Sequence, residues 1–450
     1  NTASGNCSFV GSGYQVQSLG NNSVAVGGTL NKACGVCSFV GGGFNSCAVG
    51  NHSVVGGGYL NKACNNKAFV GGGYGNQATA NCSVVAGGNC NTSSGGNSIV
   101  VGGGYNYATG AFSTVVGGGH NTSQFKNCAK ATNSGIIGGK NNTIENEGKC
   151  SFIGTGENNI SLSAFDVIVG GSSNTASGSA SFIGAGTLNE ASGKVSFIGG
   201  GTNNTASNTF SNVLGGCCNI ASQTFTTIAG GFSSRNHSSL GFIGAGQNNE
   251  LVGNRSVITG GCDNKTTGAG DFIGGGYCNT ATGTNTTVGG GICNLASSSF
   301  STVGGGCNNK ACSPITGATV GGGTGNTASG LFHPTVGGGS GNTASNTMAT
   351  VAGGCNNTSS GQHSFIGGGS NNTASGGGNA TIAGGLCNLA SGNRSTIAGG
   401  GCLSASGSYS IAGGGFNNLA CGDKSFVGGG ENNISLSALD VIAGGHTNTV

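Results

Sequence analysis

The sequence predicts an all-β fold, a parallel β-roll or β-solenoid of about thirty coils of 14–16 residues. Three observations lead to this prediction. The 450 residues include 101 Gly, no Trp and one Met, which is unlike an ordinary globular composition. One unit, close to S-[F/V/T]-[I/V]-x-G-G-x-x-N-x-A-S-G, recurs along the whole chain. The hydrophobic residues, 35% of the total, keep a fixed place in this unit, which argues against a disordered chain.

Each unit is predicted to form a strand, a turn, a second strand and a second turn. A β-prone tripeptide such as Ser151-Phe152-Ile153 opens the unit, and a Gly cluster and an Asn-rich corner follow it. A short stretch centred on Ala and closed by Ser-Gly completes it. Gly and Asn tolerate the positive φ that a sharp reversal needs. Helices are excluded over most of the chain, because each Gly in a helix interior costs about 1 kcal/mol.

Two columns of apolar residues are expected to form the core. A single unit cannot bury its own apolar face, but stacked coils can. The aliphatic residue before each Gly cluster is predicted to point inward, and its neighbour outward, because side chains alternate along a strand. This interior column includes Val26, Val40, Val55, Val70, Val85, Val101, Val116, Ile137, Ile153, Ile168, Ile183, Ile198, Ile397, Ile411, Val427 and Ile442. The opposing column is Ala33, Ala63, Ala78, Ala108, Ala176, Ala191, Ala206, Ala221, Ala281, Ala296, Ala374 and Ala390.

No shift in composition divides the chain, so residues 1–450 are predicted to form one continuous solenoid. The sequence starts and stops in mid-pattern, and we expect it to be a segment of a longer chain. The widest gap between interior positions, from Val116 to Ile137, predicts a looped-out insertion at 120–135.

The composition argues against several classes of function. A net charge of +3 with dispersed Lys and Arg gives no nucleic-acid-binding patch. No apolar run reaches the roughly 18 residues of a membrane span. The six His and eleven acidic residues are spread over different coils, so we expect no enzyme active site, no cofactor and no metal. The Gly-rich motifs recur in every coil without a following helix, unlike a phosphate-binding loop.

A column of Phe precedes the interior column and is the candidate lateral interface. If it faces outward, a single chain exposes an apolar stripe, and such stripes usually mark a protein interface. The alternative is that the inner and outer faces are reversed or that both are buried. Phe9 belongs to this column, whose predicted interface residues are Phe39, Phe69, Phe152, Phe182, Phe197, Phe242, Phe272, Phe365 and Phe426.

Twenty Cys is a high number, and several recur at the Asn corner after the Gly cluster. Neighbours in such a column would have Cα atoms roughly 4.8 Å apart, within the range of a disulfide. The alternatives are reduced, buried thiols or a metal site, for which Cys34 and Cys37 form the one CxxC. The candidate disulfide column is Cys262, Cys278, Cys293, Cys307, Cys387 and Cys402.

Asn-x-Ser/Thr sequons recur and are candidate glycosylation sites in a surface protein. The same residues also suit tight corners through local hydrogen bonds to the backbone, so both interpretations stay open. The candidate sites are Asn51, Asn81, Asn141, Asn203, Asn236, Asn264, Asn371 and Asn393.

The repeat resembles that of a known family. Asn22-Ser23-Val24-Ala25-Val26-Gly27 closely resembles the N-S-V-A-I-G motif of YadA-like head domains in trimeric autotransporter adhesins. Ala33-Cys34-Gly35 and Ala176-Ser177-Gly178 resemble the Ala-x-Gly element of the same family. The resemblance covers essentially the whole chain. It implies a left-handed parallel β-roll, a side-by-side trimer, and binding to extracellular matrix or other surfaces.

We therefore expect a structural and adhesive extracellular fibre at a cell or virion surface. Its partners would be copies of itself, in a homotrimer or filament, together with matrix, glycans or surfaces bound through many weak contacts. A virus or phage fibre, or a filament subunit, is an alternative that could use the same repeat. An ice-binding solenoid is another, because Thr302, Thr319, Thr335 and Thr350 form a predicted outward column.

Overall fold

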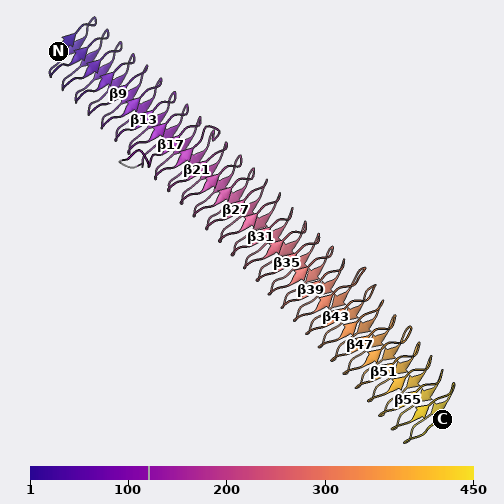
Figure 1. Cartoon of the computed structure of the whole chain (residues 1–450). Coiled ribbons are helices and arrows are strands. Elements are labelled where there is room, and N and C mark those ends of the chain that lie inside the picture. The colour runs from indigo at the N-terminus through magenta and orange to yellow at the C-terminus, as the bar shows by residue number, and fades with distance from the viewer. Residues whose placement is uncertain (120–121) are drawn as a thin grey trace. The chain divides into compact units, whose positions relative to one another are not determined.

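The computed structural model describes residues 1–119 and 122–450, and within these ranges it is all-β, without a helix. The chain divides into two units, Asn1–Gly230 and Gly231–Val450. In each unit the backbone winds into coils that stack in parallel register, each contributing two short strands (Figure 1). The predicted parallel β-solenoid is confirmed, with about 29 coils.

All strands are two residues long, and odd- and even-numbered strands alternate along the chain. In unit Asn1–Gly230 the odd-numbered strands are β1 (Thr2–Ala3), β3 (Gln17–Ser18), β5 (Lys32–Ala33), β7 (Cys47–Ala48), β9 (Lys62–Ala63), β11 (Gln77–Ala78), β13 (Thr92–Ser93), β15 (Tyr107–Ala108), β17 (Cys128–Ala129), β19 (Thr143–Ile144), β21 (Ile160–Ser161), β23 (Thr175–Ala176), β25 (Glu190–Ala191), β27 (Thr205–Ala206) and β29 (Ile220–Ala221). The even-numbered strands are β2 (Phe9–Val10), β4 (Val24–Ala25), β6 (Phe39–Val40), β8 (Val54–Val55), β10 (Phe69–Val70), β12 (Val84–Val85), β14 (Ile99–Val100), β16 (Thr114–Val115), β18 (Gly135–Ile136), β20 (Phe152–Ile153), β22 (Val167–Ile168), β24 (Phe182–Ile183), β26 (Phe197–Ile198), β28 (Asn212–Val213) and β30 (Thr227–Ile228).

Unit Gly231–Val450 repeats the same alternation. Its odd-numbered strands are β31 (Arg235–Asn236), β33 (Glu250–Leu251), β35 (Lys265–Thr266), β37 (Thr280–Ala281), β39 (Leu295–Ala296), β41 (Lys310–Ala311), β43 (Thr327–Ala328), β45 (Thr343–Ala344), β47 (Thr358–Ser359), β49 (Thr373–Ala374), β51 (Leu389–Ala390), β53 (Ser404–Ala405), β55 (Leu419–Ala420) and β57 (Ile434–Ser435). Its even-numbered strands are β32 (Phe242–Ile243), β34 (Val257–Ile258), β36 (Phe272–Ile273), β38 (Thr287–Val288), β40 (Thr302–Val303), β42 (Thr319–Val320), β44 (Thr335–Val336), β46 (Thr350–Val351), β48 (Phe365–Ile366), β50 (Thr381–Ile382), β52 (Thr396–Ile397), β54 (Ile411–Ala412), β56 (Phe426–Val427) and β58 (Val441–Ile442).

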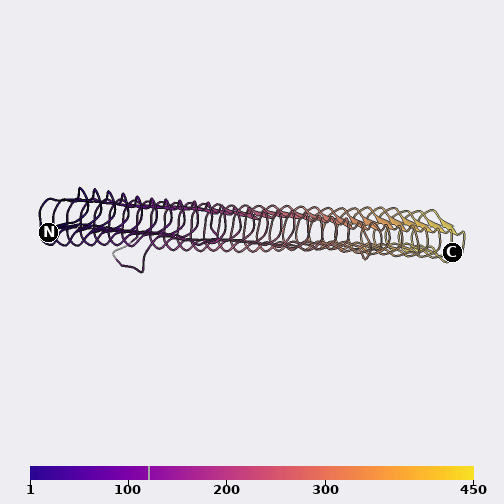
Figure 2. The ribbon, with the colours of Figure 1, turned by 90° about the horizontal axis from the view of Figure 1, so that it is seen from above.

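Within each unit, strands of one parity form a parallel sheet, so equivalent residues of successive coils lie side by side. In the odd-strand sheet Thr175 pairs with Glu190, and in the even-strand sheet Phe182 pairs with Phe197. A third column of single bridges runs along the corner between them, as at Thr187 and Thr202. Figure 2 shows this coil-on-coil arrangement within each unit. The two sheets face each other across a thin core.

The core is built from the second residue of each strand. Even-numbered strands contribute mostly Ile and Val, and odd-numbered strands mostly Ala. Every Ala of the predicted opposing column is fully buried. Ile and Val on one side against Ala on the other fill the space between two closely spaced sheets.

Five residues of the predicted interior column point outward instead. Val26, Val101, Val116, Ile137 and Ile411 are exposed. Their places are taken by Ala25, Val100, Val115, Ile136 and Ala412, which are fully buried. The error arises where aliphatic or Ala residues run together before the Gly cluster. The buried residue that precedes the strand, such as Ser98 before Ile99–Val100, sets the alternation, and the Gly cluster does not.

A ladder of buried Asn side chains lines the corner before the odd-numbered strands. The Asn174 amide Nδ2 donates to the Gly170 and Gly186 carbonyls at 3.1 and 2.9 Å. Its Oδ1 accepts the backbone N–H of Asn189 in the next coil at 3.0 Å. Each Asn therefore satisfies corner backbone groups in its own coil and in the next, which water would otherwise have to reach.

Stacking explains why the corners accept positive φ. Leu30 has φ 60°, and its N–H donates to the Tyr14 carbonyl of the preceding coil at 2.9 Å. One corner position is restricted to Gly for a second reason. Gly28 has φ +90°, and a Cβ there would lie 2.1 Å from the Gly43 carbonyl oxygen. The long Gly clusters thus follow from how closely the coils approach.

The insertion predicted at 120–135 is narrower in the structure. His120 and Asn121 lie outside the described residues. The regular coil resumes at Asn127, whose Nδ2 donates to the Gly117 and Gly139 carbonyls at 3.0 Å each, as in the rest of the ladder. Strands β17 and β18 both begin inside the predicted range.

Candidate interaction faces

The outer face of the even-strand sheet is mostly apolar, apart from a run of Thr from Thr287 to Thr350. The Phe column points outward, as one of the two interpretations of the sequence required. Phe39, Phe152 and Phe365 are 37–40% exposed. Phe182 and Phe197 are half-buried because their rings stack on each other, with centroids 5.1 Å apart. Where Phe is absent the column carries mostly Val, Ile or Thr, and in the described strands it carries no charged residue.

The Phe rings lie flat along their strands. Each Phe of the column is followed two residues later by Gly, and a Cβ on Gly41 would lie 3.3 Å from Cε1 of the Phe39 ring. The ring therefore covers the space that a side chain would fill. The Phe rings and the Gly residues beside them leave exposed apolar surface without a second side chain projecting between them.

The outer face of the odd-strand sheet is polar and carries charges. The first residues of its strands are often Thr, and seven are charged: Lys32, Lys62, Glu190, Arg235, Glu250, Lys265 and Lys310. Lys265 and Glu250 of neighbouring strands form an ion pair, with Nζ 2.8 Å from Oε2. The two faces of the solenoid thus differ in chemistry although their backbones are equivalent.

The six cysteines of the predicted disulfide column occupy two adjacent columns. Cys262 and Cys307 lie in the corner column of single bridges, three coils apart. The next position carries Cys278, Cys293, Cys387 and Cys402, all with φ between 54° and 58°. Only Cys278 with Cys293, and Cys387 with Cys402, are in-register neighbours of successive coils. All 20 cysteines are free thiols in this structure.

Two further cysteine pairs bring thiols together, and the sequence analysis did not single them out. Cys217 and Cys218 are consecutive residues whose Sγ atoms lie 3.1 Å apart. The thiol of Cys47 hydrogen-bonds to Cys34 in the preceding coil and lowers the pKa of Cys34 to about 7. The sequence signal for the second pair is the odd-strand register. Lys32 pairs with Cys47 in that register, and Cys34 lies two residues after Lys32.

The candidate glycosylation sites divide by burial. Asn51, Asn81, Asn203, Asn371 and Asn393 are exposed, and Asn141 is partly exposed. Asn236 and Asn264 are fully buried, so the prediction of glycans at these two positions does not fit the folded chain. Asn264 is a member of the Asn ladder and donates to the Gly260 and Gly276 carbonyls.

Two buried aspartates replace the usual Ser at the corner before an even-numbered strand. Asp166 Oδ1 accepts the hydroxyl of Ser181 at 2.8 Å, and its Oδ2 accepts the N–H of Ser163 at 2.9 Å. Asp271 is held in the same way by Thr286 and by the N–H of Gly268. Burial raises the pKa of both carboxyls, and the hydrogen bonds oppose this rise. Neither carboxyl reaches the surface, so both are structural.

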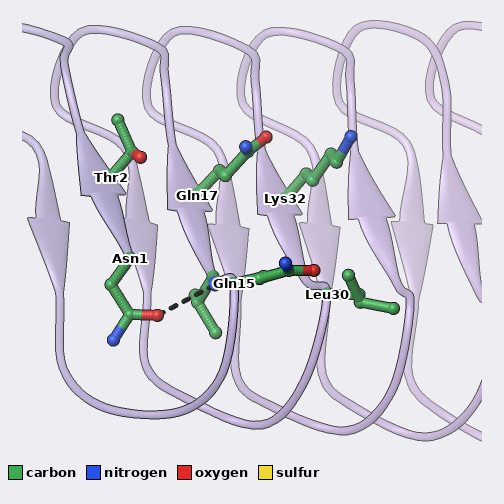
Figure 3. A pocket seen from close by; sticks show the side chains of 7 residues that line it. Asn1, Thr2, Gln15, Gln17, Leu30 and Lys32 are labelled. Carbon is green, nitrogen blue, oxygen red and sulfur yellow. Dashed lines mark hydrogen bonds between the residues drawn. The ribbon is translucent and has the colours of Figure 1, made fainter.

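A hollow of about 340 Å³ lies over the first coils (Figure 3). It is lined by Asn1, Thr2, Gln15, Val16, Gln17, Leu30 and Lys32. Asn1 Oδ1 accepts the Val16 N–H at 2.9 Å, as a ladder Asn does for the following coil. The hollow is a part of the repeat, and Lys32 is its only charged side chain.

The described part of the chain gathers no three His, Cys, Asp or Glu side chains in a position to hold a metal ion. Within residues 1–119 and 122–450 we also find no helix of the length and hydrophobicity that a membrane span requires.

Comparison with known proteins finds no family model that matches the sequence and no curated protein with significant similarity to it.

Proposed function

We propose that this chain is a structural segment of an extracellular fibre that associates side by side with copies of itself through the even-strand face. The polar face and the corners would then remain available for surfaces, matrix or glycans. One observation carries the proposal: the even-strand face exposes Phe, Val, Ile and Thr in register and carries no charge in the described strands. Its opposite face, on the same coils, carries Lys, Arg and Glu.

The physical argument for association is the free energy of removing this face from water. Burial of apolar surface contributes about 25 cal/mol per Å². A column repeated in every coil multiplies a small contact by the number of coils, provided that both surfaces keep the same register. The in-register sheets meet this condition within each unit. A partner with the same repeat has the same spacing, so a second copy is the natural occupant.

Adhesion through the other surfaces would likewise depend on the sum of many small contacts along the repeat. Corner and odd-strand side chains recur at a fixed spacing, and many weak contacts to a repetitive ligand give strong overall binding. The resemblance of Asn22–Gly27 to the head repeats of trimeric autotransporter adhesins supports a trimer and a location at a cell surface. A virus or phage fibre would use the same two faces in the same way.

Self-association provides the test. The purified 450-residue chain is expected to sediment as a trimer or a larger species at micromolar concentration. Replacing Phe152 and Phe365 by Thr, which occurs naturally in the even-strand column, should shift it toward monomer. The matched control replaces Ile160 and Leu389, exposed apolar residues on the odd-strand face, by Thr. A monomeric parent chain, or equal effects of the two pairs, would rule out association through this face.

Ice binding is kept as a second candidate because of one specific observation. Thr287, Thr302, Thr319, Thr335 and Thr350 pair in register on the even-strand face. A regular row of hydroxyl and methyl groups could order water on its surface. Thermal hysteresis of the purified chain, lost when Thr319 and Thr335 are replaced by Lys, would favour this function over the fibre. Absence of hysteresis in the parent chain would exclude it.

A further inference from the structure

The corner column that follows the single bridges brings cysteines of successive coils together twice. The Cys293 N–H donates to the Tyr277 carbonyl at 2.8 Å, and the Cys402 N–H donates to the Leu386 carbonyl at 2.9 Å. Because Tyr277 and Leu386 directly precede Cys278 and Cys387, these bonds hold each pair one strand spacing apart, roughly 4.8 Å. Disulfides span Cα separations of about 4.4–6.8 Å.

The thiols of both pairs are accessible to an oxidant, and those of the first pair are in contact. Cys278 and Cys293 are hydrogen-bonded thiol to thiol, and this bond raises the pKa of Cys293. Cys278, Cys387 and Cys402 are exposed and Cys293 is partly exposed, so an oxidant can reach them. In each pair both residues have almost the same φ, so the backbone continues in parallel through the two coils.

We infer that Cys278–Cys293 and Cys387–Cys402 are disulfide sites, each of which covalently joins two successive coils. The inference goes beyond the proposed fibre function and does not depend on it, because it uses only contacts within one chain. Cys90 lies in the same column but has Gly75 and Tyr105 as its in-register neighbours. It should stay free when the two pairs are oxidised.

The reaction requires an external disulfide, for example oxidised glutathione. The thiolate of Cys387 attacks one sulfur of the oxidant, which forms a mixed disulfide and releases one glutathione. The thiolate of Cys402 then attacks the Cys387 sulfur and releases the second glutathione. The protein loses two electrons and two protons, and the oxidant is reduced to two thiols. The same steps apply to Cys278 and Cys293.

Two competing linkages are conceivable near the first pair. Cys262 and Cys307 lie in the adjacent column, one coil before Cys278 and one coil after Cys293. Linkages Cys262–Cys278 and Cys293–Cys307 would therefore need a diagonal approach. The Cys262 thiol instead donates to Asp263 Oδ2 at 3.3 Å, in its own coil. The second pair has no such competitor, because the equivalent positions of the adjacent column, one coil before Cys387 and one coil after Cys402, are Ser370 and Phe416.

The test is a map of oxidised cysteines in the full 450-residue chain. The reduced protein is incubated with glutathione disulfide, and its free thiols are then alkylated. The remaining cysteines are reduced and labelled with a second reagent, and each position is quantified by mass spectrometry. An intrachain disulfide removes two hydrogens from the mass, whereas a mixed disulfide adds a glutathionyl group. Trypsin cleaves after Arg394, so a Cys387–Cys402 bond joins two peptides, 311–394 and 395–424.

We expect first-reagent labelling of the four cysteines to fall about tenfold after oxidation, with Cys90 free of intrachain disulfides. Cys387→Ser should restore labelling of Cys402 alone, and Cys278→Ser that of Cys293 alone. Serine occupies the same corner at Ser173 and Ser233 with φ 57° and 56°, so these variants are expected to fold. Continued labelling of the four thiols would overturn the inference, as would linkage of Cys262 with Cys278 or of Cys293 with Cys307.

Discussion

Strands β23 and β24 belong to one coil, and their side chains differ in a way that the whole molecule repeats. Strand β23 places Thr175 outside and Ala176 inside, whereas β24 places Phe182 outside and Ile183 inside. Both strands pair in parallel with the next coil in the same register. The backbone therefore does not distinguish the two sheets. The difference lies in the two side chains of each strand. The odd-strand sheet has a polar outer face and small inner residues, whereas the even-strand sheet carries large apolar residues on both its inner and its outer face.

The corners differ in the same way. Asn precedes most odd-numbered strands and bonds to backbone groups of its own and the next coil. Ser precedes most even-numbered strands, and its hydroxyl often bonds only the carbonyl three residues earlier, as from Ser53 to Gly50 at 2.6 Å. The odd-strand corner thus holds the coils together through side chains, whereas the even-strand corner mainly shapes its own turn. Substitutions can test each part of this contrast.

The largest effect is expected inside the core. Ile183→Ala should lower the local free energy of opening by about 2–5 kcal/mol, because it leaves a cavity opposite residues that are already small. Hydrogen exchange of the amides in β22, β24 and β26 measures this locally, since a long repeat does not unfold in two states.

The matched change on the odd-strand side is Ala191→Ser. Ser occupies this inner column at Ser18, Ser93 and Ser359, where it bonds the Ser five residues later at 2.6–2.7 Å. The new hydroxyl would face Ser196, whose Oγ has no partner in the described part of the chain. We expect a change within about 1 kcal/mol. Equal losses for Ile183→Ala and Ala191→Ser would show that the two inner columns do not differ in the way proposed.

The next largest effect is expected at the Asn corner. Asn174→Ala removes an amide that satisfies the Gly170 and Gly186 carbonyls and the Asn189 N–H. The Gly186 carbonyl still accepts the Ser172 N–H, but the Gly170 carbonyl and the Asn189 N–H lose Asn174 as their partner. Leaving such groups buried and unpaired costs about 1–3 kcal/mol. Ser196→Ala is the control, because Ala stands naturally in its column at Ala68 and Ala349. Exchange should increase around Asn174 and stay nearly unchanged around Ser196. The reverse result would contradict the division between the two corners.

The sequence was sufficient to predict the period and the strands, and it predicted the outward Phe column as one of two interpretations. These follow from composition and from alternation along a strand, which are local properties. The inward position failed where aliphatic residues are consecutive, as at Ile99, Val100 and Val101, because the Gly cluster is a poor reference point. Counting from the ladder Asn would also have separated the cysteines. Cys262 lies two residues before Asn264, and Cys278 lies one residue before Asn279.

The Asn ladder itself was not predicted, because its bonds join coils and a single unit does not reveal them. Asn was interpreted as a residue suited to corners or as a glycosylation site. The available signal was spacing: one Asn stands two residues before the inward Ala in most units, as Asn174 does before Ala176, while its neighbours vary. Residues that contact equivalent residues in adjacent coils are constrained more strongly than those that only turn the chain.

A smaller effect concerns the even-strand corner and pH. Burial raises the pKa of Asp166 above its usual value of 3.8 in the folded state. Its contribution to stability is therefore complete below the unfolded-state pKa and is lost as the pH rises through the folded-state pKa. Relative to Asp166→Ser, the parent chain should lose stability as the pH rises above the unfolded-state pKa of about 4. Hydrogen exchange in β22 and β24, corrected for intrinsic rates, measures the difference.

Two controls make the pH result specific to burial. Asp271→Ser should behave in the same way in the other unit, because burial also raises the pKa of Asp271. Asp423→Ser removes an exposed carboxylate and is the control for the loss of a surface charge. A parent chain that gains stability relative to Asp166→Ser as the pH rises would contradict the expected direction.

The smallest effect is expected on the polar outer face. Lys265 and Glu250 form an ion pair between neighbouring strands, with side chains 46% and 37% exposed. Exposed pairs of this kind contribute about 0.2–1 kcal/mol and are screened by salt. A double-mutant cycle with Lys265→Gln and Glu250→Gln should give a coupling in that range that declines at high salt. The stacked Phe182 and Phe197 on the other face are the comparison, since their coupling should be insensitive to salt. A coupling that is stronger and less salt-sensitive for the ion pair than for the Phe pair would show that the odd-strand face also contributes to stability. The assignment of separate roles to the two faces would then fail.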